Sequence, residues 1–295
     1  MTPLVFTLVL TSASLHVLWN ALVKASKQDK ASFAWLTSVA QVVMLLPVFL
    51  VARIWWPGPI CGQLWALAAL SGLLEGTYLI LLFEAYRRTD LSVVYPLSRG
   101  IAPIVAMWAS TWLVGDSLAF WPAVAVVTIT VGVFGISLST RQTRMESRHL
   151  EGILLAAATG CMIAGYHIVD RQAMKLTPSP NRLEYLYLLH LFMAVVVTFW
   201  MCISKKRRRS MLIAWASDWR SVLIVSLLLP TSYFMILLAL SYSNVTYVTA
   251  GRNVGILIST AVGAMLLREK VTGPRLIGIL LIACGVVALV WLRGH

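Results

Sequence analysis

Charged residues are scarce in this chain of 295 residues, because Asp, Glu, Lys and Arg together make up only 12% of it. An ordinary soluble domain carries roughly a quarter charged residues, so this chain lacks the polar side chains that would cover a water-soluble globule. Disorder is excluded as well, since 59% of the residues are apolar and disorder requires low hydrophobicity. The composition therefore predicts a protein embedded in a membrane.

Cysteines and catalytic motifs are also few. Four cysteines do not make a disulfide scaffold, and we interpret all four as free thiols. The sequence contains no H-E-x-x-H, G-x-S-x-G or Walker motif and no Cys/His spacing suited to zinc. We therefore expect no enzyme activity, no cofactor and no metal site. The N-terminus has no basic residues ahead of its first apolar run, which predicts a retained helix rather than a cleaved signal peptide.

Apolar segments long enough to cross a bilayer, which takes ~20 residues, occur ten times along the chain. They are predicted at Leu4–Val23, Ala31–Ala52, Gln63–Tyr86, Leu91–Val114, Leu118–Ser139, Gly152–Val169, Leu183–Ile203, Ser221–Leu240, Val245–Leu267 and Leu276–Leu292. Lys and Arg are concentrated in the odd-numbered connections, which the positive-inside rule assigns to the cytoplasm, with both termini outside. The basic run Lys205–Arg209 fits a cytoplasmic anchor, and a site for anionic lipid or regulation is its alternative.

The two halves of the chain are similar to each other. A shift of 153 residues places Arg99 on Arg252, Asp116 on Glu269 and Gly132 on Gly285. The same shift aligns two ridges of small residues at four-residue spacing, which let helices approach closely; they are Ser98, Ala102, Ala106 and Ser110, and Gly251, Gly255, Ser259 and Gly263. Because each half has five spans, the second half enters the membrane from the opposite side. We expect two inverted five-helix repeats, residues 1–140 and 141–295. Asp90 and Asn244 are the expected N-caps of the helices that carry the ridges.

Several short motifs resemble those of a known family. They are Trp19-Asn20, the run from Ala85 to Leu97, Gly251-Arg252-Asn253, Glu269, and the Gly-Val steps at Gly132 and Gly285. Across essentially its whole length the chain resembles EamA-type members of the drug/metabolite transporter superfamily. The resemblance implies ten transmembrane helices in two inverted repeats around a central cavity, and solute transport by alternating access in the inner or plasma membrane. Many relatives have cytoplasmic termini, whereas the distribution of Lys and Arg in this chain predicts that both termini lie outside.

Two arginines are predicted within the bilayer. Arg99 and Arg252 each lie about 12 Å from the start of their helices, which enter from opposite faces and converge toward the midplane. A central arginine costs roughly 2.5 to 3.5 kcal/mol on insertion scales, so we expect both to face a polar cavity. Their planar guanidinium groups suit a carboxylate or phosphate. The alternative is that both arginines bind backbone carbonyls or Glu75 and fix helix contacts.

Glu75 is the other charged residue expected near the bilayer centre. It could couple proton movement to transport, hold a cationic group, or pair with Arg99. The remaining candidate substrate-binding residues are polar or aromatic and lie on six of the predicted spans; they are His16, Trp19, Asn20, Tyr78, Tyr95, Ser98, Tyr166, Tyr233 and Asn253. We place Asp170 at the membrane interface. We also expect Pro96, Gly100 and Pro103 to interrupt the fourth helix, and Gly251 and Gly255 to soften the ninth.

These features favour a secondary-active carrier, since no nucleotide-binding loop is present to drive a pump. Two central arginines against one glutamate favour a small organic anion or zwitterion, such as an amino acid, a carboxylate or an organophosphorus compound. The expected partners are this substrate, membrane lipids and protons as coupling ion, with no nucleic acid. The alternatives are an exporter of aromatic or cationic compounds, a non-transporting membrane scaffold and a membrane-embedded enzyme.

Overall fold

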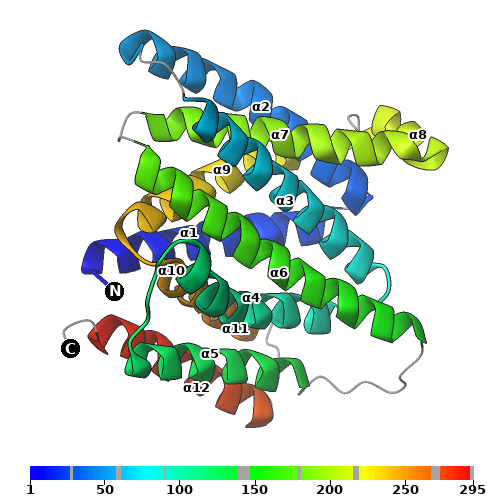
Figure 1. Cartoon of the computed structure of the whole chain (residues 1–295). Coiled ribbons are helices and arrows are strands. Elements are labelled where there is room, and N and C mark those ends of the chain that lie inside the picture. The colour runs from blue at the N-terminus through cyan, green and yellow to red at the C-terminus, as the bar shows by residue number, and fades with distance from the viewer. Residues whose placement is uncertain are drawn as a thin grey trace.

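The computed structural model describes residues 1–26, 29–57, 61–89, 91–138, 147–177, 181–214, 219–266 and 273–292. Within these ranges the chain forms twelve helices and no strand (Figure 1). They are α1 Pro3–Ala25, α2 Lys30–Trp55, α3 Gly62–Tyr86, α4 Leu91–Leu113, α5 Phe120–Leu138, α6 Ser147–Leu176, α7 Arg182–Ile203, α8 Lys205–Ala214, α9 Trp219–Tyr242, α10 Val245–Gly251, α11 Val254–Leu266 and α12 Gly273–Trp291.

Helices occupy all ten predicted spans. Seven helices in the described ranges are long and apolar enough to cross a membrane, and Phe120–Ile136 is a shorter apolar helix. The protein is therefore a multi-pass membrane protein. Two boundaries were predicted wrongly. Helix α6 continues to Leu176 instead of ending at Val169, and the basic segment after Ile203 forms helix α8 where we expected a loop.

The ninth predicted span is two helices, because the chain leaves the α-helix at Arg252 and Asn253, between α10 and α11. Tight backbone hydrogen bonds bridge the break, from the N–H of Asn253 to the carbonyl of Ala250 at 3.0 Å and from that of Gly255 to Arg252 at 3.1 Å. The predicted softening at Gly251 therefore marks a real break. The predicted interruption of the fourth helix is wrong, since α4 runs unbroken through both prolines. Membrane helices tolerate proline where neighbouring helices pack around the freed backbone.

The helix starts are capped in different ways. Thr2 and Asp29 accept hydrogen bonds from the backbone N–H groups of Val5 and Ser32 at 3.0 Å each. Asn244 stands before α10 as predicted, but its side chain makes no capping bond. The carboxylate of Asp116, from the α4–α5 connection, accepts from the Val245 N–H at 3.0 Å instead. The expected cap Asp90 and the repeat-equivalent Glu269 lie outside the described residues.

Small residues allow the helices to pack closely across the two halves. Helix α6 contacts α3 and α4, while α1 contacts α9, α10 and α11. The small-residue ridge of α4 meets α6, where a Cβ added at Gly160 would lie 2.8 Å from the Ser98 carbonyl oxygen. A Cβ added at Gly255 would meet Ala13 of α1 at 3.6 Å. Nothing is described of the packing around Gly263, the last member of the second ridge.

Helices α5 and α12 pack closely on each other at the bottom of Figure 1, and α5 also packs on α4. A Cβ added at Gly132 would lie 2.7 Å from the carbonyl oxygen of Gly278, and one at Gly285 would lie 2.5 Å from Ile129. Any side chain at these positions would push the helices apart. The two Gly-Val steps are therefore packing contacts, and the space at the centre is left to the other helices.

Candidate functional site

A small cavity of about 30 Å³ lies between helices α1, α3, α6, α7 and α9, beside the break between α10 and α11. Aromatic and apolar side chains form most of its wall, with one acidic and one basic group among them. The lining residues are His16, Trp19, Glu75, Tyr78, Leu79, Tyr166, Met193, Leu229, Ser232, Tyr233 and Arg252. Ligand pockets in proteins typically have this character, a mainly apolar wall with a few placed polar groups.

The cavity brings together seven of the twelve residues predicted from the sequence. These are His16, Trp19, Glu75, Tyr78, Tyr166, Tyr233 and Arg252. The lining does not include the other five, which are Asn20, Tyr95, Ser98, Arg99 and Asn253. Sequence reasoning missed Leu79, Met193, Leu229 and Ser232, which are ordinary residues of membrane helices and carry no signal of their own.

Arg252 reaches the cavity from the break between α10 and α11. Its Nη1 lies 2.9 Å from the Nε2 atom of His167 on α6, and the Nδ1 atom of the same ring lies 2.9 Å from the Thr249 hydroxyl oxygen. A guanidinium can only donate, so Nε2 must accept and the ring proton is assigned to Nδ1. The neutral imidazole thus orients Arg252 without neutralising its charge.

Arg99 has the same kind of partner but a different position. One of its Nη atoms binds the Nε2 atom of His16 on α1, and its guanidinium carbon lies 5.5 Å from the centre of the Tyr95 ring. The backbone beside the pair is also bonded, since Asn20 donates to the His16 carbonyl at 2.7 Å and Ser98 to the Tyr95 carbonyl at 3.1 Å. Here the histidine lines the cavity and the arginine stands behind it. Asn20, Tyr95 and Ser98 support this pair.

Glu75 is buried, with 5% of its surface exposed, and lies in the middle of α3. Its Oε2 atom has no hydrogen-bond partner. In the described residues, neither Arg99 nor Arg252 forms an ion pair with it. The predicted pairing of Glu75 with Arg99 is therefore wrong for this conformation. An unpartnered buried carboxylate oxygen is costly, so this position suits a proton or a cationic ligand group.

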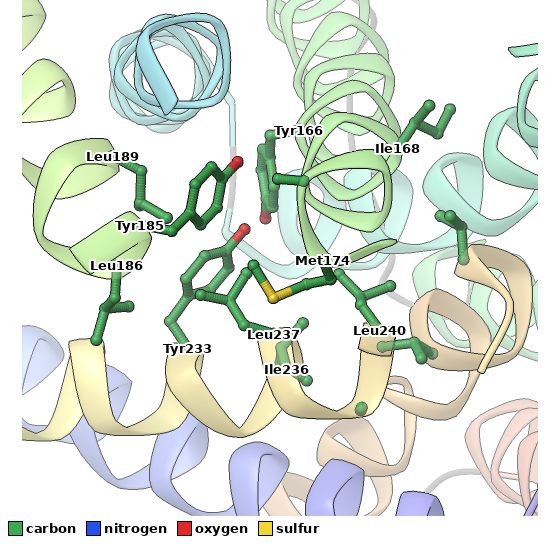
Figure 2. Close-up of a cluster of buried hydrophobic side chains, with 14 of the residues drawn as sticks. Tyr166, Ile168, Met174, Tyr185, Leu186, Leu189, Tyr233, Ile236, Leu237 and Leu240 are labelled. Carbon is green, nitrogen blue, oxygen red and sulfur yellow. The ribbon is translucent and has the colours of Figure 1, made fainter. Parts of the chain in front are cut away.

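Asp170 is fully buried, which corrects its predicted place at the membrane interface. Its carboxylate accepts hydrogen bonds from the Ser71 hydroxyl at 2.6 Å, the Tyr185 hydroxyl at 2.7 Å and the Tyr233 hydroxyl. Figure 2 shows the hydroxyl groups of Tyr185 and Tyr233 directed toward the same space, with that of Tyr166 nearby. Asp170 thus joins α3, α6, α7 and α9 immediately behind the cavity wall and fixes Tyr233.

The interface prediction failed because α6 is longer than its apolar core. Arg171 and Lys175, which follow Asp170 on the same helix, approach the carboxylate of Asp116 at 3.6 and 3.5 Å. Arg171 also donates to the carbonyl of Leu240. These contacts tie the charged end of α6 to the α4–α5 connection, with Lys175 exposed and Asp116 buried. The sequence of this helix end therefore resembles an interface, while Asp170 lies in the core.

Comparison with known proteins identifies the second half of the chain. Residues 150–291 match the EamA-like transporter family. A crystal structure of another protein shares the fold with a TM-score of 0.71 at 16% sequence identity, over 99% of this chain and 96% of that chain. No curated protein matches this sequence.

Proposed function

Since residues 150–291 are an EamA-like transporter domain and the protein is a multi-pass membrane transporter, we propose that it is a secondary-active carrier of small zwitterions that have an apolar or aromatic part. The observation that carries this proposal is the wall of the central cavity. It presents the guanidinium of Arg252 and the unpartnered carboxylate of Glu75 to one space lined with aromatic rings.

Each part of such a substrate has a matching partner. The fork of Arg252 can bind a carboxylate or phosphoryl group with two parallel hydrogen bonds, and the free Oε2 of Glu75 can accept from an ammonium group. The apolar part of the substrate would contact Trp19, Tyr78 and Tyr166. The cavity has a volume of about 30 Å³ in this conformation, below the roughly 300 to 1,000 Å³ of small-molecule sites, so the surrounding helices must move apart to admit a substrate. Amino acids and aminoalkyl phosphorus compounds have the matching charge pattern.

Two inverted repeats of five helices, residues 1–140 and 141–295, would supply the alternating access. The pairing of histidine with arginine supports this proposal, because His16 of α1 meets Arg99 of α4 as His167 of α6 meets Arg252 after α10. The exchange of contacts supports it as well, since the first helix of each half packs on the third and fourth of the other. A cavity between such halves can open to one side of the membrane at a time.

Ligand-induced thermal stabilisation tests the substrate class, because a ligand stabilises the folded state that binds it. The full chain in detergent is heated with phenylalanine, with phenethylamine, which lacks the carboxylate, and with hydrocinnamate, which lacks the amine. We expect the largest rise in melting temperature with the zwitterion. Stabilisation by hydrocinnamate alone would indicate a carrier for anions.

Export of aromatic cations is the second candidate function. The observation in its favour is that Arg99 stands outside the cavity lining, which leaves one arginine and one glutamate among several aromatic rings. Aromatic faces attract organic cations. Stabilisation by phenethylamine and not by phenylalanine would select this function over the first.

The orientation proposed from the charge pattern, with both termini outside, can be tested at Cys61. This free cysteine is exposed just before α3, on the side that the positive-inside rule assigns to the exterior. The other three cysteines lie in α6, α7 and α12 and can be replaced. We expect a membrane-impermeant maleimide to label Cys61 in intact cells. Labelling only after the membrane is opened would reverse the orientation.

A further inference from the structure

Helix α8 carries a basic groove that the transport proposal does not use. The groove is shallow and open to the surface, and is lined by Lys205, Lys206, Arg209 and Ser210. We propose that it binds the phosphate headgroup of an anionic phospholipid at the membrane surface. This proposal is independent of which solute the central cavity carries.

The four lining residues share one face of the helix. Lys205 and Arg209 are four residues apart, as are Lys206 and Ser210, and residues at this spacing lie one above the other on a helix. Three cationic side chains and a hydroxyl group therefore converge on one space. No acidic residue lines the groove, and none of these cations forms an ion pair within the described part of the chain.

This arrangement is unfavourable unless an anion is bound. Like charges four residues apart on a helix destabilise it, and Lys205 and Arg209 are such a pair within a helix of ten residues. An anion bound between the two side chains would attract both of them and offset their repulsion. A basic anchor that acts only through its total charge would not require the three cations to share a face.

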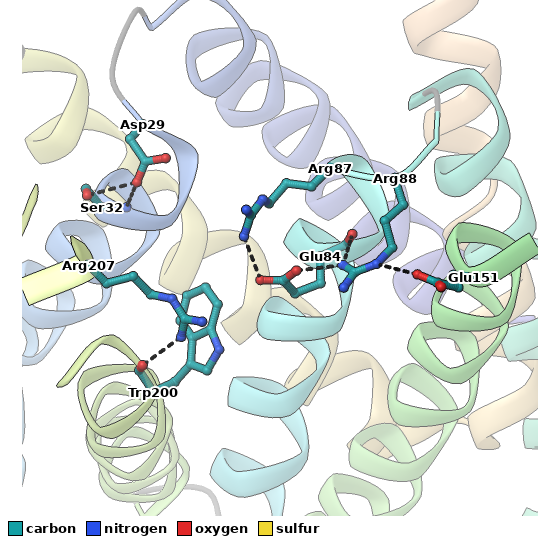
Figure 3. A network of polar contacts seen from close by, with 8 residues as sticks. All are labelled: Asp29, Ser32, Glu84, Arg87, Arg88, Glu151, Trp200 and Arg207. Carbon is teal, nitrogen blue, oxygen red and sulfur yellow. Dashed lines mark hydrogen bonds and ion pairs between the residues drawn. The ribbon is translucent and has the colours of Figure 1, made fainter. Parts of the chain in front are cut away.

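Neighbouring contacts hold the groove in place. Arg207 points away from the groove, with its guanidinium carbon 4.1 Å from the centre of the Trp200 ring and its Nη1 donating to the Trp200 carbonyl at 2.9 Å (Figure 3). On the other side, the hydroxyl of Ser32 on α2 donates to the hydroxyl of Ser210 at 2.9 Å. Helix α8 is thus fastened to both α7 and α2, and its cationic face is formed before any ligand arrives.

The apolar surface next to the groove selects a lipid over a soluble anion. Helix α7 ends at Ile203, two residues before Lys205, and Ile203 and Phe199 have 65% and 71% of their surfaces exposed. In a membrane these side chains face the acyl chains, at the level where α8 meets the headgroups. A phospholipid can place its phosphate in the groove and its chains along α7, whereas free phosphate would use only half of this surface. The charge pattern also predicts that this end faces the cytoplasm, where anionic lipids attract basic segments.

Adjacent arginines provide a matched test. Arg209 lines the groove and Arg208 does not, so Arg209→Gln and Arg208→Gln remove the same charge from the same helix. Native mass spectrometry of each full-length protein in neutral detergent can count bound phosphatidylglycerol, with phosphatidylcholine, a zwitterion of zero net charge, as the comparison lipid. We expect phosphatidylglycerol to bind more tightly than phosphatidylcholine to the unchanged protein. Arg209→Gln should lower that affinity about fivefold, which is the contribution of one basic residue near a membrane surface, and Arg208→Gln should leave it nearly unchanged.

Three results would overturn the proposal. Equal losses in the two variants would mean that the charge of α8 acts diffusely and not through a groove. Equal binding of the two lipids would show that the net negative charge of the headgroup does not determine binding. Displacement of phosphatidylglycerol by excess inorganic phosphate, with phosphate itself raising the melting temperature only when Arg209 is present, would assign the groove to a soluble anion.

Discussion

The two histidine–arginine pairs have the same chemistry but face the cavity in opposite ways. In the pair formed by His167 and Arg252, the arginine lines the cavity and the histidine is fully buried behind it. In the pair formed by His16 and Arg99, the histidine lines the cavity and the arginine lies behind. The cavity therefore receives one guanidinium and one imidazole from two pairs whose arginines are aligned by the shift of 153 residues.

The backbone around each arginine accounts for this difference. Arg99 belongs to the unbroken helix α4, where its side chain lies against Tyr95. Arg252 lies in the break between α10 and α11, where no continuous helix fixes its direction. A single interruption thus turns a symmetric pattern of residues into an asymmetric site, and an asymmetric substrate with opposite charges at its two ends fits such a site better than a symmetric anion would.

Arg252→Gln should have the largest effect on binding. The variant loses a charge-assisted hydrogen bond worth ~1.5 to 3 kcal/mol, so the affinity for the best zwitterion from the thermal screen should fall roughly ten- to a hundred-fold. Arg252→Lys should recover part of it, because it keeps the charge and loses the fork. Calorimetry on the monodisperse protein measures both. An unchanged affinity in Arg252→Gln would remove this arginine from the site.

Glu75→Gln should follow, with a loss of about tenfold in zwitterion affinity for one charged hydrogen bond. If Glu75 also carries the coupling proton, transport driven by a pH gradient should stop while exchange of substrate across the membrane continues. Proteoliposomes loaded with labelled substrate can measure the two processes separately. A variant that responds to the pH gradient as the unchanged protein does would exclude Glu75 from coupling.

Arg99→Gln sharpens the comparison directly. Because Arg99 acts on the cavity only through His16, we expect an affinity loss of about threefold, the value of an ordinary hydrogen bond. Arg252→Gln is its matched partner, since the same substitution is made at the position that a shift of 153 residues aligns with Arg99. Equal losses at the two positions would instead support a symmetric anion site, in which both guanidinium groups bind one ligand.

Asp170→Asn should change binding least. The amide keeps the size of the carboxylate but weakens its bonds to three hydroxyl groups, so we expect the free energy of unfolding to fall by about 1 to 3 kcal/mol, with less than a twofold change in affinity. Denaturation in detergent and calorimetry measure the two quantities. A large loss of affinity with normal stability would instead make Asp170, through Tyr233, a determinant of the cavity wall.

The sequence predicted the membrane helices well because each predicted span is a long apolar run, and it predicted all of the charged and aromatic cavity residues because such groups are conspicuous in a bilayer. It could not predict the bonds of Asp170, since Ser71, Tyr185 and Tyr233 come from three helices with no periodic relation to one another. The sequence also could not predict which member of each histidine–arginine pair lines the cavity. The prolines in α4 gave a stronger local signal for a helix break than Gly251 did. The structure nevertheless keeps α4 continuous and breaks the helix after Gly251.

The glycine contacts between α5 and α12 also affect the lipid around the protein. The described part of each of these helices has 19 residues and a length of about 28 Å, slightly less than the ~30 Å of a typical hydrocarbon core. Helix α2 has 26 residues and a length of about 39 Å. The described part of the pair matches a bilayer when it stands upright, whereas α2 exceeds the bilayer thickness and can match it by tilting. The protein therefore has a thin flank and a thick flank, and the acyl-chain length of the surrounding membrane should influence how easily one flank moves relative to the other.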